Sequence, residues 1–147
     1  MKQDLELDYL GGMAFEAEMN GHKVYIDADE SVGGKNSAPR PKGMMMLALA
    51  GCTGMDVVSI LRKMRVEYDA LNIKVEAELD DEFPKPYTFM KVIYRFKGDS
   101  LPKDKIIKAV NLSKDRYCGV SANYKDSFPV NHEIVLNDGE TIQLKSS

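Results

Sequence analysis

Alternating apolar and polar residues predict the first strands of this chain. Apolar side chains fall at every second position in Leu5–Tyr9, Met13–Met19 and Val24–Ala28. A period of two is typical of a strand with one buried face, and Asn20-Gly21 favours a two-residue hairpin turn. The N-terminal part is therefore predicted to form antiparallel strands, followed by a loop over 29–39 that carries several turn-forming residues.

A long helix is predicted next, beginning at Pro41, where a missing N–H costs nothing. No charged residue lies between Gly43 and Met55, so this half of the helix is apolar on every side, whereas the half up to Arg65 is amphipathic. The uncharged run is too short to span a bilayer. One helix of about 25 residues would be about 37 Å long. A chain of 147 residues can hardly surround it alone, so we infer that a second copy of the chain helps to bury it.

The remaining pattern predicts four more strands and one main helix. The expected elements are an antiparallel pair at 71–79 and 90–96, a helix from about 102 to 118, a short helical piece after it, and a closing hairpin at 134–136 and 142–144. Ser100 is expected to cap the helix. Strands and helices that do not alternate strictly predict an α+β fold, and the length predicts one domain over residues 1–147.

Charge and composition exclude several classes of protein. The chain has 20 basic and 23 acidic residues, a net charge of −3, and these charges are interspersed. This argues against a nucleic-acid-binding surface. The first residues, Met1 to Glu6, contain no apolar segment of a signal peptide, so we expect a cytoplasmic protein with no membrane partner, in which thiols are free or catalytic.

The two cysteines are the candidates with an intrinsically reactive atom. Cys52 lies within the apolar helix beside Gly51 and near Gly54, which leave space for a ligand or another backbone. A packed, unreactive thiol is the alternative interpretation. Cys118 follows three charged residues, Lys114, Asp115 and Arg116, and nearby cationic groups can lower the pKa of a thiol.

Several motifs together resemble the OsmC/Ohr family, the osmotically inducible and organic hydroperoxide resistance proteins. The first is Gly33-Gly34-Lys35-Asn36 followed by Pro39-Arg40-Pro41, and the second is a Met- and Leu-rich helix that reaches Ala50-Gly51-Cys52-Thr53. The third and most specific is Arg116-Tyr117-Cys118-Gly119-Val120-Ser121. The two cysteines are 66 residues apart, which is similar to the family's spacing, and the predicted elements fit over essentially the whole chain.

The resemblance implies an intertwined homodimer with the long helices at its centre and the active sites at the subunit interface. Such a dimer would reduce organic hydroperoxides without a cofactor. Cys52 would attack the hydroperoxide, Cys118 would resolve the resulting sulfenic acid as a disulfide, and an external dithiol, either a small molecule or a lipoyl-type protein, would reduce it. The peroxidase branches carry a glutamate before the helix, where this chain has Lys42. Arg40 and Arg116 are therefore the candidates for stabilising the Cys52 thiolate. The alternatives are a hydrophobic-ligand-binding protein and a redox sensor.

Other residues that could bind or react are interpreted more simply. His22 and His132 lack further ligands at metal-binding spacing, so no metal site is predicted. Asp56 follows Cys52 by one helical turn and either orients a polar partner or serves as a cap or an intersubunit ion pair. The three methionines at 44–46 are interpreted as packing residues, with a pliable hydroperoxide pocket as the alternative.

Overall fold

The computed structural model describes residues 1–145, which form two compact units. The first unit comprises residues 1–45, and the second begins at Met46. The helix α1 (Pro41–Lys63) begins at the end of the first unit and lies mostly in the second. The single domain expected over residues 1–147 stays a prediction.

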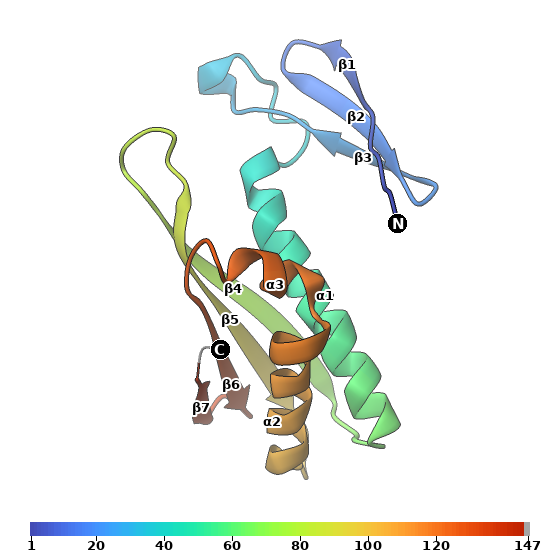
Figure 1. Ribbon diagram of the computed structural model, residues 1–147, viewed down its shortest axis with the longest axis vertical. Coiled ribbons are helices and arrows are strands. Elements are labelled where there is room, and N and C mark those ends of the chain that lie inside the picture. The colour runs from blue at the N-terminus through green and yellow to red at the C-terminus, as the bar shows by residue number, and fades with distance from the viewer. Residues whose placement is uncertain (146–147) are drawn as a thin grey trace. The chain divides into compact units, whose positions relative to one another are not determined.

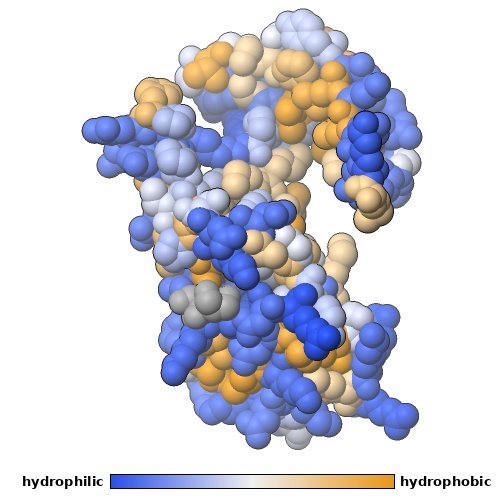
Figure 2. Space-filling view, viewed as in Figure 1, coloured by the Kyte–Doolittle hydropathy of each residue, from blue (hydrophilic) through white to orange (hydrophobic). Residues whose placement is uncertain are grey.

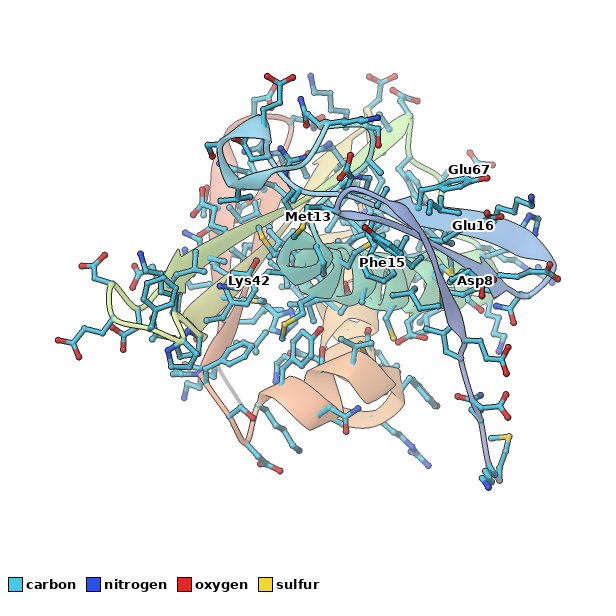
Figure 3. The ribbon with its side chains drawn as sticks, turned by 90° about the horizontal axis from the view of Figure 1, so that it is seen from above. Asp8, Met13, Phe15, Glu16, Lys42 and Glu67 are labelled. Atoms are coloured by element: carbon cyan, nitrogen blue, oxygen red, sulfur yellow. The ribbon has the colours of Figure 1, made fainter. Side chains whose placement is uncertain are left out.

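The first unit contains a three-stranded antiparallel sheet in the order β1-β2-β3. Its strands are β1 (Leu7–Gly11), β2 (Ala14–Met19) and β3 (His22–Ile26). The predicted hairpin turn is confirmed, because Asn20 and Gly21 have positive φ angles of 51° and 80°. The ring of Phe15, labelled in Figure 3, lies 5.3 Å from that of Tyr9 between ring centroids, which joins β2 to β1.

The loop after β3 is organised around the buried carboxylate of Asp27. This side chain accepts hydrogen bonds from the backbone N–H groups of Ala28, Lys35 and Ser37 and from the Ser37 hydroxyl. These bonds, the Ser37 hydroxyl foremost, hold the pKa of Asp27 well below its usual range. Gly34 closes the loop, since a Cβ there would lie 2.0 Å from the Ala28 carbonyl oxygen. The loop, which also includes a 3₁₀ turn at Glu30–Val32, thus has a fixed shape before α1 begins.

Large apolar side chains are exposed on the first unit. Figure 2 shows part of this surface as an orange area over the small sheet. The exposed large apolar residues of this unit after residue 6 are Leu7, Tyr9, Leu10, Met13, Met19, Tyr25 and Val32. Monomeric proteins rarely expose so many large apolar groups on a small sheet, so this surface is suited to contact with protein.

The second unit contains a four-stranded sheet in the order β4-β5-β6-β7. Its strands are β4 (Ala70–Leu79), β5 (Tyr87–Lys97), β6 (Val130–Leu136) and β7 (Glu140–Leu144). Two of its pairings are antiparallel, and β5 and β6 are parallel. A parallel pair requires a long crossover, and here it consists of α2 (Lys103–Leu112), a π-helical turn (Ser113–Tyr117) and α3 (Gly119–Tyr124).

The α+β class predicted from the sequence is confirmed, with two differences in detail. The parallel β5–β6 pair was not anticipated, since alternation identifies a strand but not the direction of its neighbour. The expected Ser100 cap is wrong, because α2 begins at Lys103 with Pro102 in the capping position and no side-chain cap. The short helix expected after Cys118 is confirmed as α3.

The core of the second unit lies between its sheet and its helices. Every second residue of β5 from Met90 to Phe96 is buried, and α1 contributes Leu49, Val57 and Leu61, all fully buried. Each such apolar side chain stabilises the fold by about 1.5–3 kcal/mol. In Figure 1, α1 and α2 lie side by side. Lys105 of α2 donates a hydrogen bond at 3.5 Å to the carbonyl of Met64, the residue that follows α1. This packing positions the residues described next.

The helix α1 is not surrounded by its own chain. Leu47 and Met55 are 65% and 77% exposed, although they belong to the uncharged half of the helix. By length and composition alone α1 would also suit a membrane span, a property that core helices of soluble proteins share. The exposed apolar positions agree with the expectation that a second subunit covers them.

Candidate functional site

Cys52 lies in the fourth turn of α1 and is partly buried. The sequence predicted that both nearby glycines, Gly51 and Gly54, leave space beside the sulfur. The structure shows this for only one of them. A Cβ at Gly54 would lie 2.7 Å from Cδ1 of Ile73, so this glycine allows α1 to pack closely on β4. A Cβ at Gly51 would meet nothing within 4 Å. Gly54 therefore serves packing, and Gly51 faces open space in the chain itself.

Cys118 is held where the π-helical turn meets α3. Its backbone N–H donates to the Ser113 carbonyl at 2.9 Å, and its Sγ accepts from the Ser121 N–H at 3.3 Å. The sulfur thus caps α3, and the side chain is 3% exposed. A π-helical turn adds one residue to a helical turn and occurs frequently at functional sites. Here it ends at Tyr117, immediately before the buried sulfur.

The fold brings the two cysteines and Asp56 together. The Sγ atoms of Cys52 and Cys118 and a carboxylate oxygen of Asp56 all lie within 4.8 Å of one another. A disulfide requires an S–S distance of about 2.05 Å, so a small movement suffices to join the sulfurs. We refer to these three residues as the thiol cluster.

Asp56 lies in the cluster because it follows Cys52 by one turn of α1. Asp56 is partly buried. Its Oδ2 accepts a hydrogen bond from the Ser113 hydroxyl at 3.0 Å. This bond joins α1 to the π-helical turn within one chain. It agrees with the interpretation that Asp56 orients a polar partner, which here is Ser113.

Tyr94 and His132 form a buried polar pair in the second unit. The Tyr94 hydroxyl and Nδ1 of His132 are 3.1 Å apart, within hydrogen-bonding distance, and the rings are stacked. Burial raises the pKa of Tyr94, so its hydroxyl keeps its proton at physiological pH. Burial, helped by the charge of Lys114, lowers the pKa of His132 to about 4. Both groups are therefore neutral at physiological pH.

The sequence suggested that cationic neighbours lower the pKa of Cys118, but in the structure this pKa is raised. Its pKa is raised, first by burial and then by the adjacent Cys52 sulfur. The Ser121 hydroxyl and N–H act in the opposite direction but do not outweigh burial. Cys118 therefore carries its proton at neutral pH.

Comparison with known proteins identifies the family of this chain. The profile of the family described as OsmC-like protein matches residues 34–133, which include the whole thiol cluster. The chain belongs to the OsmC-like protein family. Protein YhfA of Escherichia coli (strain K12) is 29% identical over 125 residues, which cover 84% of this chain and 90% of that protein.

Solved structures share the OsmC-like fold. A hypothetical protein from Aquifex aeolicus has a TM-score of 0.81 at 22% identity, covering 93% of this chain and 97% of that chain. An organic hydroperoxide resistance protein OsmC from Legionella pneumophila has a TM-score of 0.62 at 13% identity, covering 91% and 96%. These likenesses confirm the fold that the resemblance implied.

The two arginines expected to stabilise the thiolate in this OsmC-like protein make other contacts. Arg40 donates to Asn36 Oδ1 at 2.7 Å and to the Ala38 carbonyl at 3.0 Å, and it pairs with Asp29 at 3.3 Å. These bonds fix the loop before α1. Arg116 is exposed, and its guanidinium lies 5.8 Å from the centre of the Tyr117 ring. Their proposed role stays a prediction.

Lys114 is the basic residue near Cys118 that points inward. It is buried and pairs with the carboxylate of Asp115. Sequence reasoning singled out Arg116 instead, because the π-helical turn that directs Lys114 inward leaves no signal in the sequence. The effect of Lys114 reaches His132, whose pKa it lowers.

The thiol cluster also has the donor atoms of a metal site. Two sulfurs and one carboxylate oxygen form a set that suits a thiophilic cation. A dithiol redox pair also requires two sulfurs close together. The short distance between the sulfurs therefore fits a redox pair as well as a metal site. The expectation of no metal stays a prediction, and the histidines on which it was based lie on β3 and, beside Tyr94, on β6.

Two cavities in the second unit lie beside α1 but are not lined by either cysteine. The larger, about 830 Å³, is bordered by charged and polar residues near the end of α1, among them Arg62, Tyr68 and Lys105. The other, about 510 Å³, is mostly apolar and is lined by Ala50, Gly51, Gly54, Met55, Val58, Ser59, Arg62, Leu71 and Ile73. This second cavity is open to solvent, and Met55 in its lining is 77% exposed.

Proposed function

We propose that this OsmC-like protein is a thiol peroxidase that reduces organic hydroperoxides through Cys52 and Cys118. The observation that carries the proposal is the approach of the two sulfurs, which lie within 4.8 Å of each other although 66 residues separate them in the sequence. The different burial of the two cysteines supports a separate role for each. Cys52 is the more accessible thiol and meets the hydroperoxide, whereas the buried Cys118 resolves the product.

The reaction has three balanced steps. The Cys52 thiolate attacks the terminal oxygen of ROOH, the O–O bond breaks, and the alkoxide takes a proton and leaves as ROH. The thiol of Cys118 then condenses with the Cys52 sulfenic acid to give a disulfide and water. An external dithiol, either a small molecule or a lipoyl-type protein, restores both thiols by exchange and is itself oxidised to a disulfide.

The surroundings of Cys52 support an organic substrate. Cys52 belongs to the part of α1 that carries no charge from Gly43 to Met55, so an alkyl or acyl group would meet apolar side chains there. The name of the Legionella pneumophila relative, an organic hydroperoxide resistance protein, agrees with this substrate class.

A homodimer in the cytoplasm completes the proposal. The exposed apolar residues Leu47 and Met55 of α1 need a cover, and a second copy of the chain provides one of the same chemistry. The cytoplasm supplies the reducing environment in which both cysteines stay thiols between turnovers.

Positive charge near Cys52 is a further part of this proposal. Arg40 and Arg116 remain the candidates, since a cation favours the thiolate over the thiol. We expect Arg40→Ala or Arg116→Ala to slow the reaction of Cys52 with tert-butyl hydroperoxide about tenfold, equivalent to about 1.4 kcal/mol. Unchanged rates in both variants would show that neither arginine acts on the thiolate.

Consumption of tert-butyl hydroperoxide in the presence of a dithiol such as dihydrolipoamide tests the function. The wild-type protein should turn over repeatedly, Cys52→Ser should be inactive, and Cys118→Ser should consume about one equivalent before it stalls. The exposed Ser127 offers a control, because Ser127→Ala should keep full activity. Equal consumption by the wild type and by Cys52→Ser would refute the proposal.

Binding of a hydrophobic ligand is a second candidate, favoured by the apolar cavity of about 510 Å³ beside α1. Lys42 in place of the usual glutamate also fits a protein that does not turn over. A fluorescent fatty acid should then bind with one site per chain, and Ile73→Lys, which places a charge in the cavity lining, should abolish binding. Peroxidase turnover together with no fatty-acid binding would exclude this candidate.

A further inference from the structure

Disulfide formation at the thiol cluster requires Cys118 to lose its proton. Cys118 has to attack as a thiolate, yet burial and the neighbouring Cys52 sulfur raise the pKa of Cys118. A thiol that keeps its proton at neutral pH attacks slowly unless a nearby group accepts that proton. The chemistry therefore calls for a proton acceptor within reach of Cys118.

The neighbours of Cys118 on each packed element can be compared as acceptors. On β5 and α3, Tyr94 and Tyr124 are neutral phenols whose pKa values are raised. On β6, His132 lies behind Tyr94 and its pKa is about 4. In the π-helical turn, Lys114 is cationic and pairs with Asp115, which is about half exposed. On α1 the groups are Cys52, which reacts itself, and Asp56.

Asp56 is the group whose position beside both sulfurs is established. A carboxylate oxygen lies within 4.8 Å of both sulfurs, so a small side-chain movement or one bridging water brings it to the attacking thiol and to the leaving hydroxyl of the sulfenic acid. The Ser113 hydroxyl donates to Oδ2 at 3.0 Å and holds the carboxylate toward the π-helical turn that ends just before Cys118. A carboxylate has about four acceptor sites, so this bond leaves room for a further proton.

We propose that Asp56 is the proton acceptor for Cys118 in the step that forms the disulfide, with Ser113 as its positioning residue. The inference rests on the proposed function, because it concerns the second step of that reaction. Asp56 takes the proton from Cys118, and the thiolate attacks the sulfenic sulfur of Cys52. As the S–S bond forms, the S–OH bond breaks, and the hydroxide takes the proton from Asp56 and leaves as water.

Single-turnover kinetics separate the two steps. Reduced protein is mixed with one equivalent of tert-butyl hydroperoxide and quenched at intervals, and mass spectrometry measures dimedone-trapped sulfenic acid and disulfide. In Asp56→Asn, sulfenic acid should form at the wild-type rate or faster, because a negative charge beside the thiolate has been removed. Disulfide formation should slow by at least about tenfold.

The pH profile distinguishes proton transfer from a structural effect. In Asp56→Asn the disulfide rate should rise about tenfold per pH unit through neutral pH, because hydroxide replaces the carboxylate as base, whereas the wild-type profile should be flatter. Asp56→Glu should restore part of the rate. Ser113→Ala should slow the same step several-fold and serves as the second variant if Asp56→Asn folds poorly.

The exposed Asp126 provides a matched control, and Asp126→Asn should leave both rates unchanged. Wild-type disulfide rates in both Asp56→Asn and Ser113→Ala would overturn the role of Asp56 while leaving the peroxidase proposal intact. Absence of any sulfenic acid in the wild type and in Cys118→Ser would instead overturn the proposed function, and this inference with it.

Discussion

Tyr94 and His132 are buried as neutral groups. His132 is 2% exposed and shares a hydrogen bond with Tyr94, and Lys114 is the cation whose charge reaches it. A charged imidazole there would lose its hydration and face a positive charge. At the scale of single residues, His132 is therefore held in its neutral form.

This arrangement predicts an acid-sensitive fold. The pKa of His132 is lowered from 6.5 to about 4, so the unfolded chain binds a proton between these values that the folded chain rejects. Stability is present above pH 6.5 and is lost as the pH falls toward 4. The contribution is roughly 3 kcal/mol.

Urea unfolding at pH 7 and at pH 4.5 measures this effect. The wild-type free energy of unfolding should fall by roughly 2–3 kcal/mol more than that of His132→Gln over the same interval. Because Asp27 and other carboxylates titrate in both proteins, the difference between them isolates His132. Equal falls in the two proteins would show that His132 is not buried in its neutral form.

Helix α1 illustrates how one element serves both packing and chemistry. Gly54 allows its close contact with β4, where a Cβ would lie 2.7 Å from Cδ1 of Ile73. Two positions earlier, Cys52 is presented toward Cys118, and one turn after Cys52 lies Asp56. The distance between α1 and β4 therefore affects how the thiol cluster is held.

A double-mutant cycle tests this contact. Gly54→Ala adds helix propensity worth about 1 kcal/mol but creates an overlap with Ile73. Ile73→Val removes the Cδ1 atom that overlaps. Gly54→Ala should therefore be more favourable by about 1 kcal/mol in the Ile73→Val background than in the wild type, as measured by denaturant unfolding. An identical effect in both backgrounds would mean that the two residues do not meet.

The elements were largely predictable from the sequence because alternation and helical periodicity are local signals. The parallel pairing of β6 was not, since it depends on a crossover of three helical segments between residues 97 and 130. The site was predictable in part. The closeness of Cys52 and Cys118 followed from the family resemblance, and Asp56 from helix geometry. The contact between Tyr94 and His132, 38 residues apart, depends on strand register and has no local signal.

Exposed apolar surface is the main property of the whole chain that remains to be accounted for. Leu47 and Met55 on α1 and several residues of the small N-terminal sheet are uncovered in one chain. Each unit therefore presents surface that water solvates poorly. A homodimer whose interface buries more than about 2,000 Å² of accessible surface accounts for these exposed residues.

Sedimentation velocity checks this at micromolar concentration. The wild type should sediment as a dimer, and Met55→Lys, which places a charge in the exposed apolar surface of α1, should weaken or abolish the dimer. A stable, well-folded wild-type monomer would contradict the dimer and would require another cover for α1.

The central claim is that Cys52 and Cys118 form one peroxide-reactive pair, and the oxidation state of the two sulfurs tests it most directly. Reduced protein is treated with one equivalent of tert-butyl hydroperoxide, alkylated under denaturing conditions and analysed by mass spectrometry. We predict an intrachain Cys52–Cys118 disulfide in the wild type and a trapped sulfenic acid on Cys52 in Cys118→Ser. Two fully alkylated, unoxidised thiols in the wild type would contradict the claim.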